Sequence, residues 1–212
     1  MDSLHSHVGG SLSYSGRDDS NTINGALALG SDSGSGDLAG VVHLSRKDSH
    51  EVNRSAEEDP DAQSRTQKSL FSKLGYTLPS GNRLRLDVSI FDEQVATDVV
   101  SVLGFGRQFR NTTSLQGDDE RRRHAVTAGY DFQPDWNLID QSRINAYWQQ
   151  VKVDQRTTEI REPINRLNQR NFRYDTETFS LTVDFESTFS TRRTDYRIGG
   201  GMSLEHGEIT EL

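Results

Sequence analysis

The sequence predicts an all-β fold, an antiparallel up-and-down meander of about nine long strands. Apolar and polar residues alternate along most of the chain, and a period of two is the pattern of a strand with one apolar and one polar face. Clusters of Gly, Pro, Asn, Asp and Ser separate the alternating segments, as turns do. Only 32% of the 212 residues are hydrophobic, which suits a sheet that has one wet face.

The clearest element is a β-hairpin over residues 69–91. Its first arm, residues 69–78, alternates between apolar and polar side chains. The Pro-Ser-Gly-Asn sequence at 79–82 supplies the fixed and positive φ angles of a tight turn. The second arm alternates without interruption, and its apolar face is made by Leu84, Leu86, Val88 and Ile90. The rest of the chain repeats this unit.

The remaining strands are expected on both sides of the hairpin, at residues 8–14, 21–30, 38–46, 121–133, 138–153, 171–185 and 192–204. Three polar segments without apolar periodicity are expected to be long loops, at residues 47–66, 92–120 and 154–170. Within the second loop, the apolar residues 99–105 are expected either to pack or to form a short strand. Because the alternation runs close to both ends of the sequence, we expect residues 1–212 to be a piece of a longer β protein.

An up-and-down meander places alternate connections at opposite ends of the sheet, so the three long loops share one end. Short turns at one end and long loops at the other are typical of an outer-membrane barrel. The expected strands exceed the ~5–6 residues usual in soluble sheets and reach the ~9–11 residues that cross a bilayer. Aromatic residues near the ends of the apolar faces fit interfacial girdles: Tyr14, Tyr76, Tyr130, Phe132, Phe185 and Tyr196. These observations favour part of a transmembrane β-barrel.

A soluble β-sandwich also alternates apolar and polar residues, because its apolar faces pack against each other. Periodicity alone does not distinguish a face turned to lipid from a face turned to a protein core. A soluble or surface-exposed β-sheet binding module, such as an adhesin or a carbohydrate binder, is therefore the alternative hypothesis.

Composition and motifs disfavour several classes of function. A net charge of −8 and a pI of about 5.2 argue against a nucleic-acid partner. The absence of cysteine excludes disulfides, zinc–thiolate sites and catalytic thiols. No motif assembles a hydrolase triad, and residues 104–106 (Gly-Phe-Gly) lack the strand–glycine–helix context of a nucleotide loop. We therefore expect no catalytic residues and no enzyme activity.

Histidines are the remaining candidates for ligand contacts: His5, His7, His43, His50, His124 and His206. His50 falls in the first expected long loop, so it is the candidate ligand-binding residue. His5 and His7 share one face of a strand. They are interpreted either as ligands of a metal or haem or as ordinary polar side chains. His124 is expected at the solvated mouth of a strand, and no set of metal ligands is predicted.

Residues 118–123 form a charged run, Asp-Asp-Glu-Arg-Arg-Arg. Two interpretations are open. Either the arginines face lipopolysaccharide phosphates at the outer rim of a barrel, or the run neutralises itself at the base of a loop. The Arg- and Glu-rich residues 156–170 invite the same two interpretations.

Together these segments resemble the barrel of TonB-dependent outer-membrane receptors, and within them the haem/haemoglobin (transferrin/lactoferrin) receptor group. The resemblance is carried by residues 9–14 (GGSLSY), 69–76 (SLFSKLGY), 121–130 (RRRHAVTAGY), 144–149 (INAYWQ), 196–201 (YRIGGG) and 206–207 (HG). It implies a barrel of about 22 strands with an amino-terminal plug. Residues 1–212 would form a partial barrel domain of such a receptor, with the plug and the remaining strands absent.

The resemblance also implies a place and partners for the protein. It implies the bacterial cell outer membrane, uptake of haem or another iron source, and contacts with outer-membrane lipid and lipopolysaccharide, the TonB–ExbB–ExbD complex, and haem or a host haem protein. The family's haem-ligand histidines lie in the plug and in a loop with a Phe-Arg-Ala-Pro-type motif, which this sequence lacks. No haem ligand is therefore carried over to a residue here, and haem or an iron chelate is expected as a transported ligand, not as a cofactor.

Overall fold

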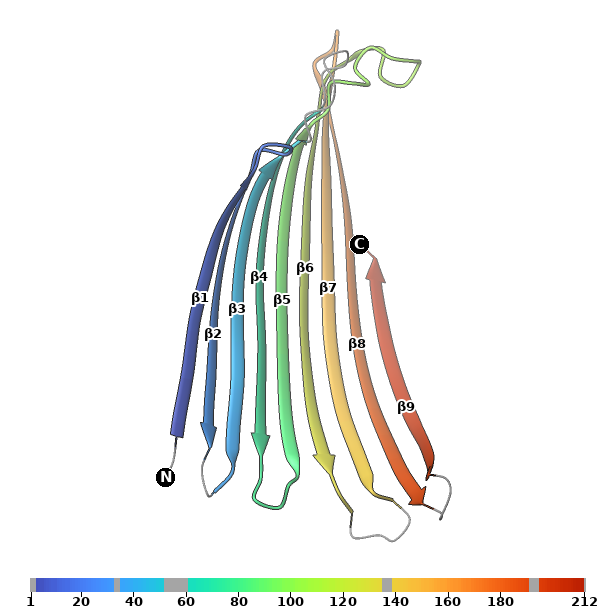
Figure 1. The fold of residues 1–212 in the computed structure, drawn as a ribbon. Helices are drawn as coiled ribbons and strands as arrows, with labels where there is room; N and C mark the ends of the chain where they lie inside the picture. Colours follow the sequence, from blue (N-terminus) through green and yellow to red (C-terminus); the bar gives the residue numbers. More distant parts are fainter. Residues whose placement is uncertain (1–2, 33–34, 52–60, 135–138, 191–194, 212) are drawn as a thin grey trace.

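The computed structural model describes residues 3–32, 35–51, 61–134, 139–190 and 195–211. Within these ranges nine strands form one sheet in chain order (Figure 1). The strands are β1 (Ser3–Ser15), β2 (Ser20–Asp32), β3 (Asp37–His50), β4 (Ala62–Thr77), β5 (Arg83–Asp98), β6 (Thr112–Phe132), β7 (Gln141–Arg161), β8 (Arg166–Ser190) and β9 (Asp195–Glu211). A helix long and apolar enough to cross a membrane is not found in these ranges.

Every strand pairs antiparallel with the next strand of the chain. Odd-numbered strands therefore run in one direction and even-numbered strands in the other (Figure 1). The predicted fold class, an antiparallel up-and-down meander of about nine long strands, is confirmed. The central hairpin forms as expected: Gly81 adopts a φ of 85° in its turn, and the Leu78 N–H donates to Asn82 O over 2.7 Å.

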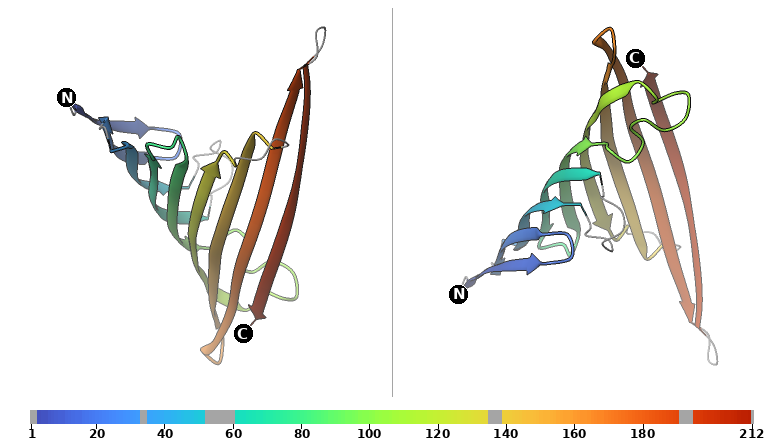
Figure 2. Two further views of the ribbon diagram at one scale, coloured as in Figure 1. Left: turned by 90° about the horizontal axis from the view of Figure 1, so that it is seen from below. Right: turned by 90° about the horizontal axis from the view of Figure 1, so that it is seen from above.

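The sheet is curved but not closed, and β1 and β9 form its two edges (Figure 2). In the part of the chain that the structure describes, each strand contacts only its sequence neighbours. No second layer therefore covers either face there, and no hydrophobic side chain of these ranges is buried. The described sheet has no hydrophobic core of its own.

The segments predicted as long loops contain much more strand than expected. In the first, β3 continues to His50 and β4 begins at Ala62. In the second, β5 continues to Asp98 and β6 begins at Thr112, which leaves residues 99–111 as the connection. These strand ends are mostly polar on both faces, and their few apolar residues show no periodicity, although backbone pairing does not require one.

The prediction of a long loop at residues 154–170 is wrong. β7 and β8 instead form a hairpin that turns at residues 162–165. Opposite charges assist the ladder of this hairpin, because Arg173 Nη2 donates to Asp154 Oδ2 over 2.8 Å. By the bounds of the strands, the predicted asymmetry between long and short connections therefore holds between β3 and β4 and between β5 and β6, but not between β7 and β8.

Residues 99–105 form turns and loop, and not the short strand that their apolar character allowed. Residues 52–60 of the first predicted loop, residue 138 of the predicted strand 138–153 and residues 192–194 of the predicted strand 192–204 lie outside the described residues.

Candidate functional site

One face of the sheet carries a continuous apolar band. Directly paired residues of neighbouring strands share a face, and the register aligns one apolar row across seven strands: Leu38, Tyr76, Leu84, Tyr130, Ile144, Val183 and Met202. β1 and β2 extend the band, with Val8 opposite Leu27 and Leu12 opposite Ile23. Val8 and Leu12 are 83% and 80% exposed, so none of the described residues covers them.

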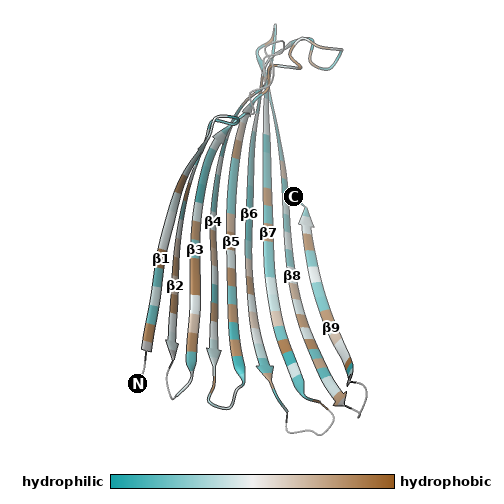
Figure 3. Cartoon of the chain, viewed as in Figure 1, coloured by the Kyte–Doolittle hydropathy of each residue, from teal (hydrophilic) through white to brown (hydrophobic). Residues whose placement is uncertain are grey.

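The band has a limited height. On β5 it runs from Leu84 to Ile90, which is about 20 Å along the strand at ~3.3 Å per residue. This is close to the ~25 Å apolar band of outer-membrane barrels. The row of paired residues one step beyond Ile90, on the same face, is charged on β3 to β8: Arg46, Lys68, Asp92, Arg122, Lys152 and Asp175. In Figure 3 hydrophobic and hydrophilic residues alternate along the lower half of β5, whereas the upper part of β7 is mostly hydrophilic.

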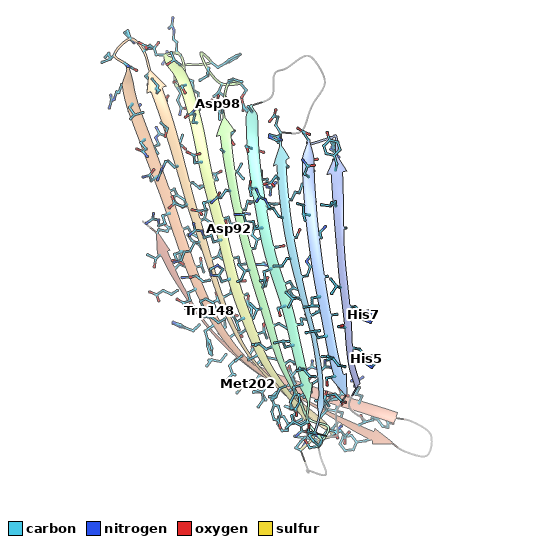
Figure 4. All side chains as sticks on the ribbon, turned by 90° about the vertical axis from the view of Figure 1, so that its left-hand side faces the viewer. His5, His7, Asp92, Asp98, Trp148 and Met202 are labelled. Carbon is cyan, nitrogen blue, oxygen red and sulfur yellow. The ribbon has the colours of Figure 1, made fainter. Side chains whose placement is uncertain are left out.

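Aromatic side chains lie at both borders of the apolar band. At the short-turn border, the rings of Tyr130 and Phe132 stack with their centroids 5.2 Å apart, and Asn82 Nδ2 donates to Tyr130 Oη over 3.0 Å. At the other border, Trp148 Nε1 donates to Glu177 Oε1 over 2.6 Å (Figure 4 labels Trp148). Tyr130 and Trp148 each place an apolar ring in the band and a polar group at its border, as side chains at a membrane–water interface do.

The opposite face is polar at the same height and is held by an ion-pair network. Arg85 Nε lies 3.0 Å from Asp131 Oδ2, and Arg143 Nε donates to Asp131 Oδ1 over 2.7 Å. Arg85 Nη2 also donates to Asn145 Oδ1 over 2.9 Å. The Arg85 side chain crosses Gly129, where a Cβ atom would come 2.8 Å from Nη2. Glycine at this position therefore makes room for the network.

Glu93 is a nearly buried carboxylate on the polar face, beyond the apolar band. Its side chain is 8% exposed. Arg65 Nε and Gln67 Nε2 donate to Glu93 Oε1 over 2.7 and 2.6 Å, and Arg121 Nη1 lies 3.9 Å from Glu93 Oε2. The charge of Glu93 is thus compensated by two guanidinium groups, which is what a buried carboxylate requires.

Glu159 is a second nearly buried carboxylate on the polar face, closer to the β5–β6 connection. Thr112 Oγ1 and Arg161 Nε donate to Glu159 Oε1 over 2.6 and 2.8 Å, and Asn168 Nδ2 donates to Oε2 over 3.4 Å. Beside it lies a cavity of about 120 Å³ that residues of the 99–111 connection also line. These bonds tie the far ends of β6, β7 and β8 together.

Asp61 anchors the 99–111 connection to the start of β4. Its Oδ1 accepts hydrogen bonds from the backbone N–H groups of Val100 and Ser101, both over 2.8 Å, and its Oδ2 accepts one from Ser101 Oγ over 2.9 Å. These bonds, the Ser101 N–H foremost, hold the pKa of the Asp61 carboxyl below its ordinary value. The carboxylate therefore holds the connection at neutral pH.

His50, the candidate ligand-binding residue, lies at the end of β3. Its side chain is 56% exposed, and its Nδ1 lies 3.4 Å from Asp19 O and 3.7 Å from Asp19 Oδ2. His50 lines an open groove of about 460 Å³ together with Gln63 and Thr97, and no other histidine lines that groove. The position is accessible to a ligand, but no second histidine assists it there.

The other histidines are dispersed over the sheet. His5 and His7 lie on β1 and point to the same side of it (Figure 4), which is the polar face, and His43 lies on the polar face of β3. His124 and His206 lie on the face of the apolar band. His124 is in the middle of β6, so its predicted place at a solvated strand mouth is wrong. Across the described residues, no group of three or more His, Cys, Asp or Glu side chains is placed to hold a metal ion.

The charged run at residues 118–123 is divided between the two faces. Arg122 lies on the face of the apolar band and pairs with Glu120, whereas Arg121 lies on the polar face near Glu93. Both arginines therefore have carboxylate partners, and the run is a part of β6 rather than the base of a loop.

Asp131, Glu93 and Glu159 are not identified as important from the sequence. Asp131 could have been found from the sequence, because it lies on the polar side of an alternating strand. That strand pairs with the strand that carries Arg83 and Arg85. Glu93 and Glu159 fall in segments that were expected to be loops, and their partners come from strand ends distant in sequence.

The fold and its faces define an open antiparallel β-meander with one apolar band and one charged face. Comparison of the sequence with protein-family models and with curated proteins found no match. A functional proposal therefore depends on the residues and the geometry described above.

Proposed function

We propose that this chain forms part of the wall of a bacterial outer-membrane β-barrel, with its apolar band against lipid and its polar face toward a water-filled lumen. The observation that carries the proposal is the band, which crosses all nine strands, ends at a charged row on β3 to β8 and is uncovered by the described residues. In water, an exposed apolar surface of this extent drives association. Bilayer hydrocarbon covers such a surface without a second protein layer.

The same geometry supports an orientation. At the end that holds His50 and the 99–111 connection, β5 to β8 continue past the band with polar side chains on both faces. In outer-membrane barrels the longer connections are extracellular and the short turns are periplasmic. In this proposal, His50 and the 99–111 connection therefore lie outside the cell, and the β4–β5 turn lies in the periplasm.

Within this class we propose a TonB-dependent receptor that takes up haem or another iron source. Its support is the order of the receptor-like motifs, which fall on strands that cross the band: residues 9–14 on β1, 69–76 on β4, 121–130 on β6 and 144–149 on β7. His50 is exposed where an extracellular haem or host haem protein would arrive. The TonB–ExbB–ExbD complex is the proposed energy source for the transport.

Insertion into lipid tests the barrel proposal. The chain is refolded into phosphatidylcholine vesicles as a Trp136→Phe variant, in which Trp148 is the single tryptophan. We expect the chain to float with the vesicles and brominated lipids to quench Trp148, since this residue lies at the border of the band. A monodisperse, cooperatively unfolding chain in detergent-free buffer, with unquenched Trp148, would instead support the soluble binding module.

A further inference from the structure

The far end of the sheet presents two apolar side chains to solvent. This outer tip consists of the 99–111 connection and of residues 161–170, the end of the β7–β8 hairpin. The Glu162 N–H joins the two parts, because it donates to Asn111 O over 2.9 Å, and both parts lie at the top of Figure 1. Phe105 of the connection is 74% exposed, and Ile164 of the hairpin is 84% exposed.

The connection is folded in a way that keeps Phe105 exposed. Gly104 and Gly106 flank it with φ angles of 76° and 60°, which glycine adopts without strain. The Phe105 N–H donates to Val102 O over 3.1 Å, and the Gly104 N–H donates to Phe109 O over 3.0 Å. Phe109 lines the cavity of about 120 Å³ described above. The same short segment therefore covers one phenyl ring and leaves the other in solvent.

The outer tip is cationic, although the whole chain has a net charge of −8. It carries five arginines and one glutamate, Glu162. Arg161 is paired with Glu159. The other four arginines have no salt-bridge partner in the ranges that the structure describes: Arg107, Arg110, Arg166 and Arg170. Arg166 also lies directly opposite Arg161 across the hairpin, and like charges in that position cost stability.

The outer tip also lies far from the apolar band. On β7, Arg161 is 13 residues beyond Trp148 at the border of the band, which is about 43 Å along the strand at ~3.3 Å per residue. Even at a strand tilt of ~45° this leaves about 30 Å between the tip and a bilayer around the band. Salt screens charges beyond ~8 Å. The unpaired arginines therefore act on something other than that bilayer.

We propose that the outer tip docks on a second membrane that contains anionic phospholipid, with Phe105 and Ile164 in its interface and the unpaired arginines against its head groups. Exposed apolar side chains beside cations are the combination that binds a protein to a membrane surface. A fluid bilayer admits side chains from two separate segments, whereas a protein partner needs a surface shaped to them. The inference goes beyond the proposed function and does not rest on it, since the tip carries these groups whatever covers the band.

Vesicle flotation tests the docking. The full chain is held in a non-ionic amphipathic polymer, which covers its apolar band, and is mixed with vesicles of phosphatidylcholine alone or of equal parts phosphatidylcholine and phosphatidylserine. We expect the chain to float with the anionic vesicles and to be released at high ionic strength, because salt screens the head-group charges. A chain inserted through its band would stay bound.

Two arginine variants are compared in this assay. Arg166→Gln should weaken binding to the anionic vesicles about fivefold. Arg83→Gln makes the same change at the opposite end of the sheet, at another exposed arginine without a salt-bridge partner among the described residues. It should leave the binding unchanged.

The apolar side chains are tested in the same way. Phe105→Ser and Ile164→Ser should each weaken binding to the anionic vesicles about tenfold, because each removes an apolar group from the interface, whereas Phe105→Leu should bind as the wild type does. Depth is measured with Phe105→Trp combined with Trp136→Phe and Trp148→Phe, so that position 105 holds the single tryptophan. Brominated phosphatidylcholine in the anionic vesicles should quench it.

The outcomes separate this inference from the proposed function. Equal binding to the two kinds of vesicle, an unquenched tryptophan at position 105, or equal effects of Arg166→Gln and Arg83→Gln overturns the docking. Release of the chain by soluble glycerophosphoserine also overturns it, since the arginines then recognise the head group alone. Insertion of the band into phosphatidylcholine vesicles, followed by Trp148, is measured in parallel. Insertion without docking rejects this inference alone, whereas docking without insertion rejects the proposed function alone.

Discussion

Arg85 of β5 and Asp131 of β6 form an ion pair beside Gly129, with Arg85 Nε 3.0 Å from Asp131 Oδ2. The pair lies at the height of the apolar band, because its neighbours in sequence, Leu84 and Tyr130, belong to that band. Charged side chains at such a depth are costly when they face lipid. The sheet avoids that cost because alternation directs the ion pair to the opposite face.

Gly129→Ala should disturb the network around Arg85. The added Cβ would lie 2.8 Å from Arg85 Nη2 and 2.9 Å from Asn145 Oδ1, so both side chains must shift. Because only the ends of two flexible side chains have to move, we expect the free energy of unfolding, measured by urea titration of the refolded chain, to fall by about 0.5–1.5 kcal/mol. Gly117→Ala is the matched control on the same strand, since its Cβ meets nothing within 4 Å. Equal effects of the two substitutions would contradict the role assigned to Gly129.

Val88→Lys should prevent or strongly weaken insertion into bilayers. Val88 occupies the middle of the band on β5, and a lysine facing the bilayer midplane costs ~2–4 kcal/mol. Ser89→Lys introduces the same charge one residue later on the polar face and should insert normally. Both are measured by vesicle flotation and protease protection. If Val88→Lys inserts as well as Ser89→Lys does, the assignment of the lipid-facing side is wrong.

Asp61→Ala should release the 99–111 connection while the sheet stays intact. Without the carboxylate, the Val100 and Ser101 amides lose their acceptor, so hydrogen–deuterium exchange of this connection should accelerate. The pKa of Asp61 is lower in the folded chain than its ordinary value. The tether is therefore present above the unfolded pKa and is lost only as pH falls through the lower, folded pKa.

The pH dependence gives the tether a second test. Between pH 7 and pH 5, exchange in residues 99–111, corrected for its intrinsic pH dependence, should not change in the wild type. Faster exchange over that range in the wild type, or unchanged exchange in Asp61→Ala, would show that another contact holds the connection.

His50→Ala should weaken the binding of hemin if this residue contacts the transported ligand. We expect a loss of roughly tenfold, or ~1.4 kcal/mol, in titrations followed by the Soret absorbance. His124→Ala is the control, because His124 lies in the middle of β6, opposite Ile90, whereas His50 lies at the end of β3. If the two substitutions weaken hemin binding equally, or if neither weakens it, His50 has no specific role in binding hemin.

The strands that cross the apolar band were predictable from the sequence, because alternation of apolar and polar side chains specifies both the strand and its face. Leu84 to Ile90 illustrates this, since the pattern and the observed face agree. The polar strand ends were not predictable in this way. Thr157 and Arg170 carry no periodic signal, and only their pairing across the β7–β8 hairpin shows that both are in strands.

The candidate site was less predictable than the fold. His50 was identified by its residue type and expected exposure, and it is exposed at a strand end. An open apolar groove of about 550 Å³ over β2 to β5 depends on the alignment of Gly25 with Leu70 through β3, which no local pattern specifies. Networks such as that of Glu93 likewise join residues more than 25 positions apart.

The up-and-down order has a consequence for closure. β1 and β9 are both odd-numbered members of the meander, so the two edges of the sheet run in the same direction. Joined directly to each other, they would form a parallel seam. A barrel in which all neighbours are antiparallel has an even number of strands. Closing this sheet in that way therefore takes an odd number of additional strands, whichever polypeptide supplies them.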